Sequence, residues 1–170
     1  NVTIPEDLVL CSIAGGNYDI IHILEKFIRN NQKSLSIAIC FFRFDLIEFL
    51  IDSCDFPVGK NEIITAIKFH NFWFFKEYCH KVFDALKSDF FNMIFIAADF
   101  SNTLALGYFI EVLKMDITQY VSNNNVFIDS ISNENICVLR FLLFENVFKI
   151  NYKNDIKTPL FNINDIIPSL

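Results

Sequence analysis

The adjacent pair Cys79-His80 is the one place in the sequence where a thiol and an imidazole stand together. Such a pair could supply a nucleophile and a base, but neighbouring residues on a helix point in different directions. The other two histidines lie apart from this pair, His22 on the outer face of a predicted helix and His70 in a predicted turn. We therefore expect no catalytic residues and predict that the protein is not an enzyme.

No pattern for a metal or a cofactor accompanies these residues. The cysteines are widely spaced, and no second Cys or His pair follows at zinc-finger spacing. Their apolar neighbours predict buried, reduced thiols in an intracellular protein. Gly15-Gly16 is isolated and is interpreted as a helix-ending turn, not as a phosphate-binding loop. The sequence thus predicts no metal ion and no cofactor. The cysteines are Cys11, Cys40, Cys54, Cys79 and Cys137.

Composition narrows the class of protein further. The chain has 170 residues, 53% of them hydrophobic, which excludes a disordered chain. A net charge of −6 argues against nucleic-acid binding, because a phosphate backbone requires a basic surface. No apolar run approaches the roughly 18–20 residues that span a bilayer, and no signal peptide is evident. We expect an intracellular, cytoplasmic protein that does not insert into membranes.

One pattern recurs along the chain and predicts the elements that position these side chains. An apolar segment with one small residue is followed by a short polar break and then by a second apolar segment with helical spacing. The small residues recur at intervals of 26, 28, 31 and 33 residues. A small side chain lets helices of adjacent units approach closely, and stacking buries faces that one unit cannot bury alone. The small residues are Ser12, Ala38, Ala66, Ala97 and Ser130.

This pattern resembles the ankyrin repeat. Gly16-Asn17 stands where the family usually has Gly-His, and Ile20-Ile21 stands where it has paired β-branched residues. The segment 151–161 is similar to the family's turn and helix start, with Thr158 as the cap and Pro159 at the first helical position. The first three units are shorter than the usual repeat of about 33 residues.

The resemblance implies an all-α fold, an ankyrin-like α-solenoid of about five stacked helix-turn-helix units and a truncated sixth. We expect a single domain over 1–170, as a segment of a larger protein. Another solenoid of helical hairpins or an irregular helical bundle would fit the same pattern. The predicted units lie near 7–32, 33–60, 61–91, 92–124 and 125–157, with the partial unit at 158–170.

The resemblance also implies a binding surface, because ankyrin repeats bind proteins with a concave face formed in part by the end of each inner helix. Phe41, Phe69 and Phe100 fall at equivalent places in three successive units, with Lys68 and Asp99 beside them. An exposed aromatic row is typical of a binding hot spot. Alternatively, the three rings fill gaps between helices.

Trp73 is a further candidate for a protein contact. It lies within four consecutive aromatic residues, 72–75, and these cannot all face inward from one helix. Trp73 is the one expected to meet solvent, because it lies opposite the side on which Phe74 and Tyr78 face the core.

The function that these observations favour is a non-catalytic protein–protein interaction scaffold whose partner is another protein. The alternative is a structural cap or spacer of a longer solenoid without a partner of its own, in which Phe69→Ser would destabilise the protein. A helical enzyme would need a deep pocket with convergent polar groups, for which the sequence offers no candidates.

Overall fold

The computed structural model describes residues 4–115 and 135–144, and these residues form helices and turns without a strand. The all-α prediction is therefore confirmed for the part of the chain that is described. The α-helices are α1 (Glu6–Gly15), α2 (Tyr18–Arg29), α3 (Lys33–Cys40), α4 (Phe44–Asp52), α5 (Lys60–Lys68), α6 (Phe72–Cys79), α7 (Phe90–Asp99), α8 (Thr103–Glu111) and α11 (Ile136–Phe144), and a 3-10 helix, η1 (Asp84–Asp89), precedes α7.

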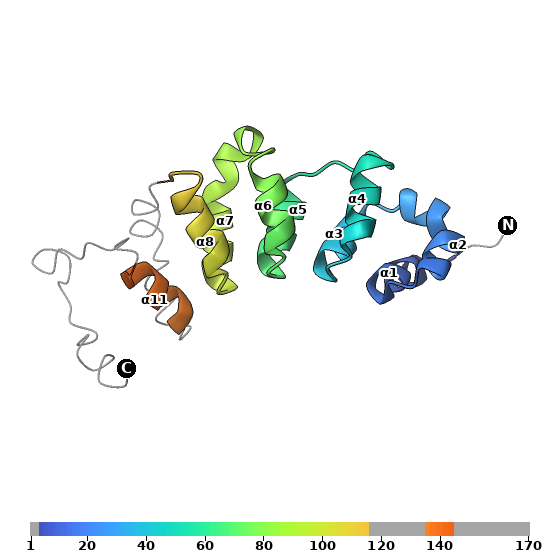
Figure 1. Cartoon of the computed structure of the whole chain (residues 1–170), viewed down its shortest axis with the longest axis horizontal. Helices are drawn as coiled ribbons and strands as arrows, with labels where there is room; N and C mark the ends of the chain where they lie inside the picture. Colours follow the sequence, from blue (N-terminus) through green and yellow to red (C-terminus); the bar gives the residue numbers. More distant parts are fainter. Residues whose placement is uncertain (1–3, 116–134, 145–170) are drawn as a thin grey trace, which may run out of the picture.

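The helices pack as hairpins that follow one another in chain order. α1 packs on α2, α3 on α4, α5 on α6 and α7 on α8. The first helices of the hairpins also pack on one another in succession, α1 on α3, α3 on α5 and α5 on α7. Figure 1 shows the result, a curved row that runs from α1 and α2 at one end to α11 at the other. The hairpins begin at residues 6, 33, 60 and 90, against predicted unit starts at 7, 33, 61 and 92.

The small residues are buried on first helices that pack on one another. Ser12, Ala38, Ala66 and Ala97 are all buried, one on each of α1, α3, α5 and α7. A larger side chain at these places would hold the contacting helices apart. Burial at four of the five positions agrees with the predicted close contact of helices, while Ser130 lies outside the described residues.

Aromatic side chains supply much of the core between the later hairpins. The Phe75 and Phe109 rings lie 5.4 Å apart, and the Phe90 and Phe109 rings lie 5.7 Å apart, both edge to face. All three side chains are fully buried. Edge-to-face pairs of this kind add to the hydrophobic free energy of burial. Some of the 21 phenylalanines of the chain therefore fill the core and do not form a surface.

A residue with a positive φ angle ends the turn inside each hairpin. The φ angles are 69° at Gly16, 56° at Phe42, 57° at His70 and 57° at Ser101. Glycine adopts this left-handed conformation without strain, whereas the other three residues do not. The prediction of a helix-ending turn at Gly15-Gly16 is confirmed, since Gly16 caps α1 in the left-handed conformation.

Asparagines at the start of the second helices join neighbouring hairpins. Asn71 is buried; its side-chain oxygen accepts from the Phe74 N–H at 3.1 Å, which caps α6. Its side-chain nitrogen donates to the Ile39 carbonyl of α3 at 2.9 Å, so the same amide also bonds the preceding hairpin. The arrangement recurs at Asn102, which caps α8 and donates to the Ile67 carbonyl at 2.8 Å, and at Asn135, which donates to the Ala98 carbonyl at 2.7 Å.

Some expectations from the sequence need correction or lie outside the described residues. The prediction that the cysteines are buried was wrong for most of them, since only Cys79 is buried, while Cys40 and Cys54 are half-buried and Cys11 and Cys137 are exposed. The helix η1 was not predicted. The turn at Thr158-Pro159, the truncated unit 158–170 and most of the unit at 125–157 lie outside the described residues.

Candidate protein-binding surface

Phe41, Phe69 and Phe100 occupy one repeated backbone position. Each directly follows the last residue of a first helix, α3, α5 or α7, with φ and ψ of −103° and 12°, −97° and 10°, and −89° and 11° respectively. The N–H of each donates to the carbonyl four residues earlier. Because the helix end and the backbone angles repeat, each of these side chains is attached at the equivalent place of its hairpin. We call these three residues the Phe row.

The rings of the Phe row are exposed. The exposed fraction is 50% for Phe41, 51% for Phe69 and 40% for Phe100. Side chains that filled gaps between helices would be buried like Phe75 and Phe109, which are fully buried. The exposure therefore favours the interpretation that the row is a surface.

Lys68 and Asp99 are the last residues of α5 and α7, directly before Phe69 and Phe100, and both are exposed. The Lys68 ammonium lies 5.3 Å from the centre of the Phe100 ring, on the next hairpin. A cation above an exposed ring contributes about 0.5–1 kcal/mol. The structure thus brings Lys68 and Phe100 together and places a positive and a negative side chain along the row.

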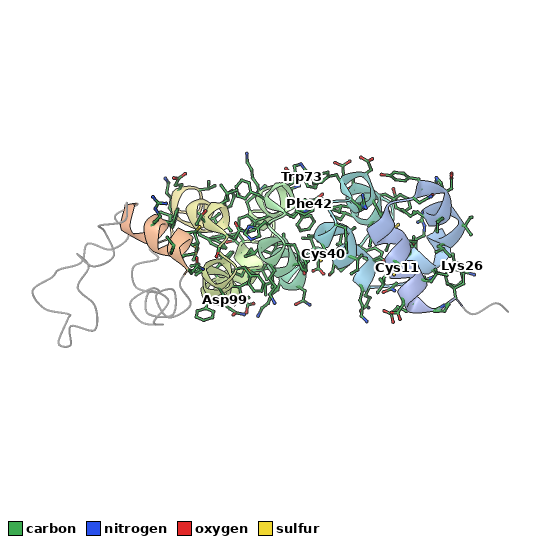
Figure 2. The ribbon with its side chains drawn as sticks, turned by 90° about the horizontal axis from the view of Figure 1, so that it is seen from below. Cys11, Lys26, Cys40, Phe42, Trp73 and Asp99 are labelled. Carbon is green, nitrogen blue, oxygen red and sulfur yellow. The ribbon has the colours of Figure 1, made fainter. Side chains whose placement is uncertain are left out.

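Trp73 lies apart from the Phe row. Its side chain is 39% exposed, while Phe74 and Phe75 are buried, so the prediction that Trp73 meets solvent is confirmed. Its ring lies 5.0 Å from the Phe44 ring of the preceding hairpin. Figure 2 shows Trp73 beside Phe42 on one side of the molecule and Asp99 on the other.

Phe42 and Phe44 are exposed aromatics that the sequence did not single out. They are 44% and 41% exposed, and their rings lie 6.3 Å apart. The sequence offered one indication for Phe42, because Phe42 occupies the turn position that His70 and Ser101 occupy in later units. A phenylalanine in a left-handed turn was unexpected there, because bulky residues avoid this conformation.

Cys79 and His80 are the neighbouring thiol and imidazole that could supply a nucleophile and a base. Burial raises the pKa of the Cys79 thiol to about 12, so the thiol is protonated at neutral pH and is a poor nucleophile. His80 is exposed, and its Nδ1 lies 3.4 Å from the Lys76 carbonyl oxygen. The chemistry of this pair is therefore that of a core thiol beside a surface imidazole.

Within 4–115 and 135–144, no three His, Cys, Asp or Glu side chains are grouped so that they could hold a metal ion. Over the same residues, no helix has both the length and the apolar character needed to cross a bilayer.

The comparisons with known proteins match part of the chain to a family model. A family model described as a domain of unknown function (DUF3447) matches residues 1–78. The matched segment contains α1 to α5 and α6 up to Tyr78, and therefore the first two members of the Phe row as well as Trp73. No curated protein and no solved structure matches the chain.

Proposed function

We propose that the chain is an ankyrin-like solenoid segment that acts as a non-catalytic scaffold and binds another protein through the Phe row. The observation that carries this proposal is the recurrence of an exposed phenylalanine at one backbone position on three successive first helices. The chain-ordered hairpins and the buried small residues between first helices support the solenoid part of the proposal.

Burial of the Phe row would supply much of a binding free energy. A phenylalanine side chain that is half exposed leaves roughly 100 Å² of apolar surface in water, and covering it contributes about 2–3 kcal/mol. Three such rings in a row are a typical set of hot-spot anchors for apolar side chains of a partner. Lys68 and Asp99 at the edge would set the orientation of the partner through its charges.

The test is affinity capture from a native lysate with the full chain. Phe41→Ser, Phe69→Ser and Phe100→Ser are introduced together and compared with wild type. The matched control changes three exposed apolar residues outside the row, Ile23, Leu104 and Val112, to Ser. We expect partners recovered with wild type and the control to be lost with the row variant. Equal recovery with a folded row variant would contradict the proposal.

The alternative function is that of a structural cap or spacer of a longer solenoid. The contact of Lys68 with the Phe100 ring favours it, because this contact joins neighbouring hairpins within the chain. If the row serves stability alone, Phe69→Ser lowers the free energy of unfolding and the wild type recovers no partner. Urea unfolding of Phe69→Ser and Ile23→Ser separates the two functions. A spacer predicts that Phe69→Ser unfolds at a lower urea concentration than Ile23→Ser, whereas a scaffold predicts similar urea concentrations for both variants.

A further inference from the structure

A second exposed aromatic surface lies across the second helices α4 and α6. Phe44, the first residue of α4, and Trp73, near the start of α6, meet edge to face with ring centres 5.0 Å apart. Phe42 extends this contact, since its ring lies 6.3 Å from that of Phe44. All three side chains are exposed. We call Phe42, Phe44 and Trp73 the outer aromatic cluster, and Figure 2 shows two of its members, Phe42 and Trp73, close together.

The solvent face of α4 beside this cluster is acidic. Asp45, Glu48 and Asp52 are exposed and spaced three and four residues apart, so they lie on one side of the helix. They are its only charged residues. None of them forms an ion pair with another described residue, although Asp45 accepts a hydrogen bond from the Tyr18 hydroxyl at 3.1 Å. Three like charges along one helix repel one another.

The charges of two α4 carboxylates act on an aromatic side chain of α6. The Trp73 and Tyr78 ring centres lie 6.5 Å apart. Burial is the main reason why the pKa of Tyr78 is raised, and the charges of Asp52, Glu77 and Glu48 raise it further, while Lys81 lowers it. The charges of Asp52 and Glu48 therefore reach Tyr78, whose ring contacts that of Trp73.

Cations of the chain also lie near this surface, among them Lys81, whose pKa the charge of Asp52 helps to raise. Lys81 pairs with Glu77 at 2.7 Å and lies 4.5 Å from the centre of the Tyr78 ring. Arg29 pairs with Glu25 at 2.6 Å, and Arg43 donates to the carbonyl of Ala14. The rings of Phe44 and Trp73 thus combine the negative face of an aromatic system with nearby carboxylates that form no ion pair with a described residue.

From this arrangement we infer that the outer aromatic cluster and the acidic face of α4 bind a basic peptide segment of a partner protein, rich in arginine or lysine. The cations pack against Phe44 and Trp73 and pair with Asp45, Glu48 and Asp52. Charge complementarity selects this occupant over a second copy of the chain, because the chain has a net charge of −6 and would meet like charges at this surface. Arginine suits the surface best, since its planar guanidinium stacks on rings and binds carboxylates through two hydrogen bonds.

Trp73 reports on this surface directly, because it is the only tryptophan in the chain. A hexa-arginine peptide is titrated into the full chain while tryptophan emission is recorded, and hexa-glutamate serves as the comparison peptide. We expect a saturable change in tryptophan emission with hexa-arginine and no change with hexa-glutamate. Binding of hexa-arginine should weaken as the salt concentration is raised. A complete lack of response in low salt would overturn the assignment.

Matched charge variants separate a specific surface from general attraction to an acidic protein. Asp45→Asn, Glu48→Gln and Asp52→Asn together should weaken hexa-arginine binding about tenfold or more. Asp7→Asn, Asp99→Asn and Glu111→Gln remove the same number of exposed charges, and Asp99 lies on the side opposite to Trp73 (Figure 2), so binding should weaken less than about twofold. Equal losses in the two variants would overturn the inference.

The aromatic contribution is tested with Phe44→Leu, which keeps an apolar side chain and removes the ring. Binding should weaken about two- to fivefold, and an unchanged affinity would show that the rings take no part. The inference is independent of the Phe row, since Phe41→Ser, Phe69→Ser and Phe100→Ser together should leave hexa-arginine binding unchanged. Emission that depends on protein concentration without peptide would assign the surface to a second copy of the chain and overturn the inference.

Discussion

The side-chain amide of Asn71 links two hairpins, because it donates to the Ile39 carbonyl at 2.9 Å while its oxygen caps α6 through the Phe74 N–H. Asn71 is buried, and both of its hydrogen-bond partners are backbone groups. Backbone groups that lose their partners in such places are costly. The same residue type at the same place in later hairpins, Asn102 and Asn135, makes this link a repeated feature of the fold.

We predict that Asn71→Ala lowers the free energy of unfolding by about 2–3 kcal/mol, since it removes a helix cap and a buried hydrogen bond. The matched control is Asn17→Ala. Asn17 is exposed and caps only its own helix, α2, by accepting from Asp19 and Ile20. Its loss should cost about 1 kcal/mol. Urea unfolding of both variants measures the difference, and equal costs would show that the bond to Ile39 contributes nothing.

The left-handed turn at His70 gives a prediction of increased stability. Its φ of 57° is strained for any residue with a Cβ, so His70→Gly should raise the free energy of unfolding by about 0.5–1 kcal/mol. His80 has a φ of −69°, where glycine only adds freedom to the unfolded chain. His80→Gly should therefore destabilise the protein by up to about 1 kcal/mol. Thermal unfolding should move upward for the first variant and downward for the second.

The buried thiol of Cys79 predicts a loss of stability in alkali. Its pKa is raised from 9.0 to about 12 by burial, so above pH 9 the unfolded chain releases this proton while the folded chain keeps it. The stabilisation is complete below pH 9 and is lost as the pH rises toward 12. Between about pH 9 and 10.5 the wild type should lose about 1–2 kcal/mol more than Cys79→Ala. Urea unfolding under reducing conditions checks this, and parallel pH curves would contradict it.

The pattern of apolar and small residues was enough to predict the helical hairpins. The burial of Ala38, Ala66 and Ala97 follows from the spacing, because a recurrent small residue inside an apolar segment marks a close helix contact. The exposure of the Phe row was not predictable in the same way. A phenylalanine at a helix end can turn toward the core or toward solvent, and the backbone angles of the turn together with the side-chain rotamer decide between them.

Two features escaped prediction because they depend on contacts between units. The Asn71 bond to Ile39 joins residues 32 apart, and the sequence shows only a polar residue in a turn. The meeting of Phe44 with Trp73 likewise depends on the packing of α4 beside α6. Local periodicity predicts which face of a helix is buried, but it does not predict which exposed side chains of neighbouring hairpins meet.

Site-specific photocrosslinking shows most directly whether the Phe row contacts a protein partner. Phe69 is replaced by benzoyl-phenylalanine in the full chain, and the same residue is placed at Ile23, which is 77% exposed on α2, as the control. After irradiation in native lysate, we expect a discrete crosslinked protein from position 69 and none from position 23. Crosslinks from position 23 alone, or the same products from both positions, would contradict it.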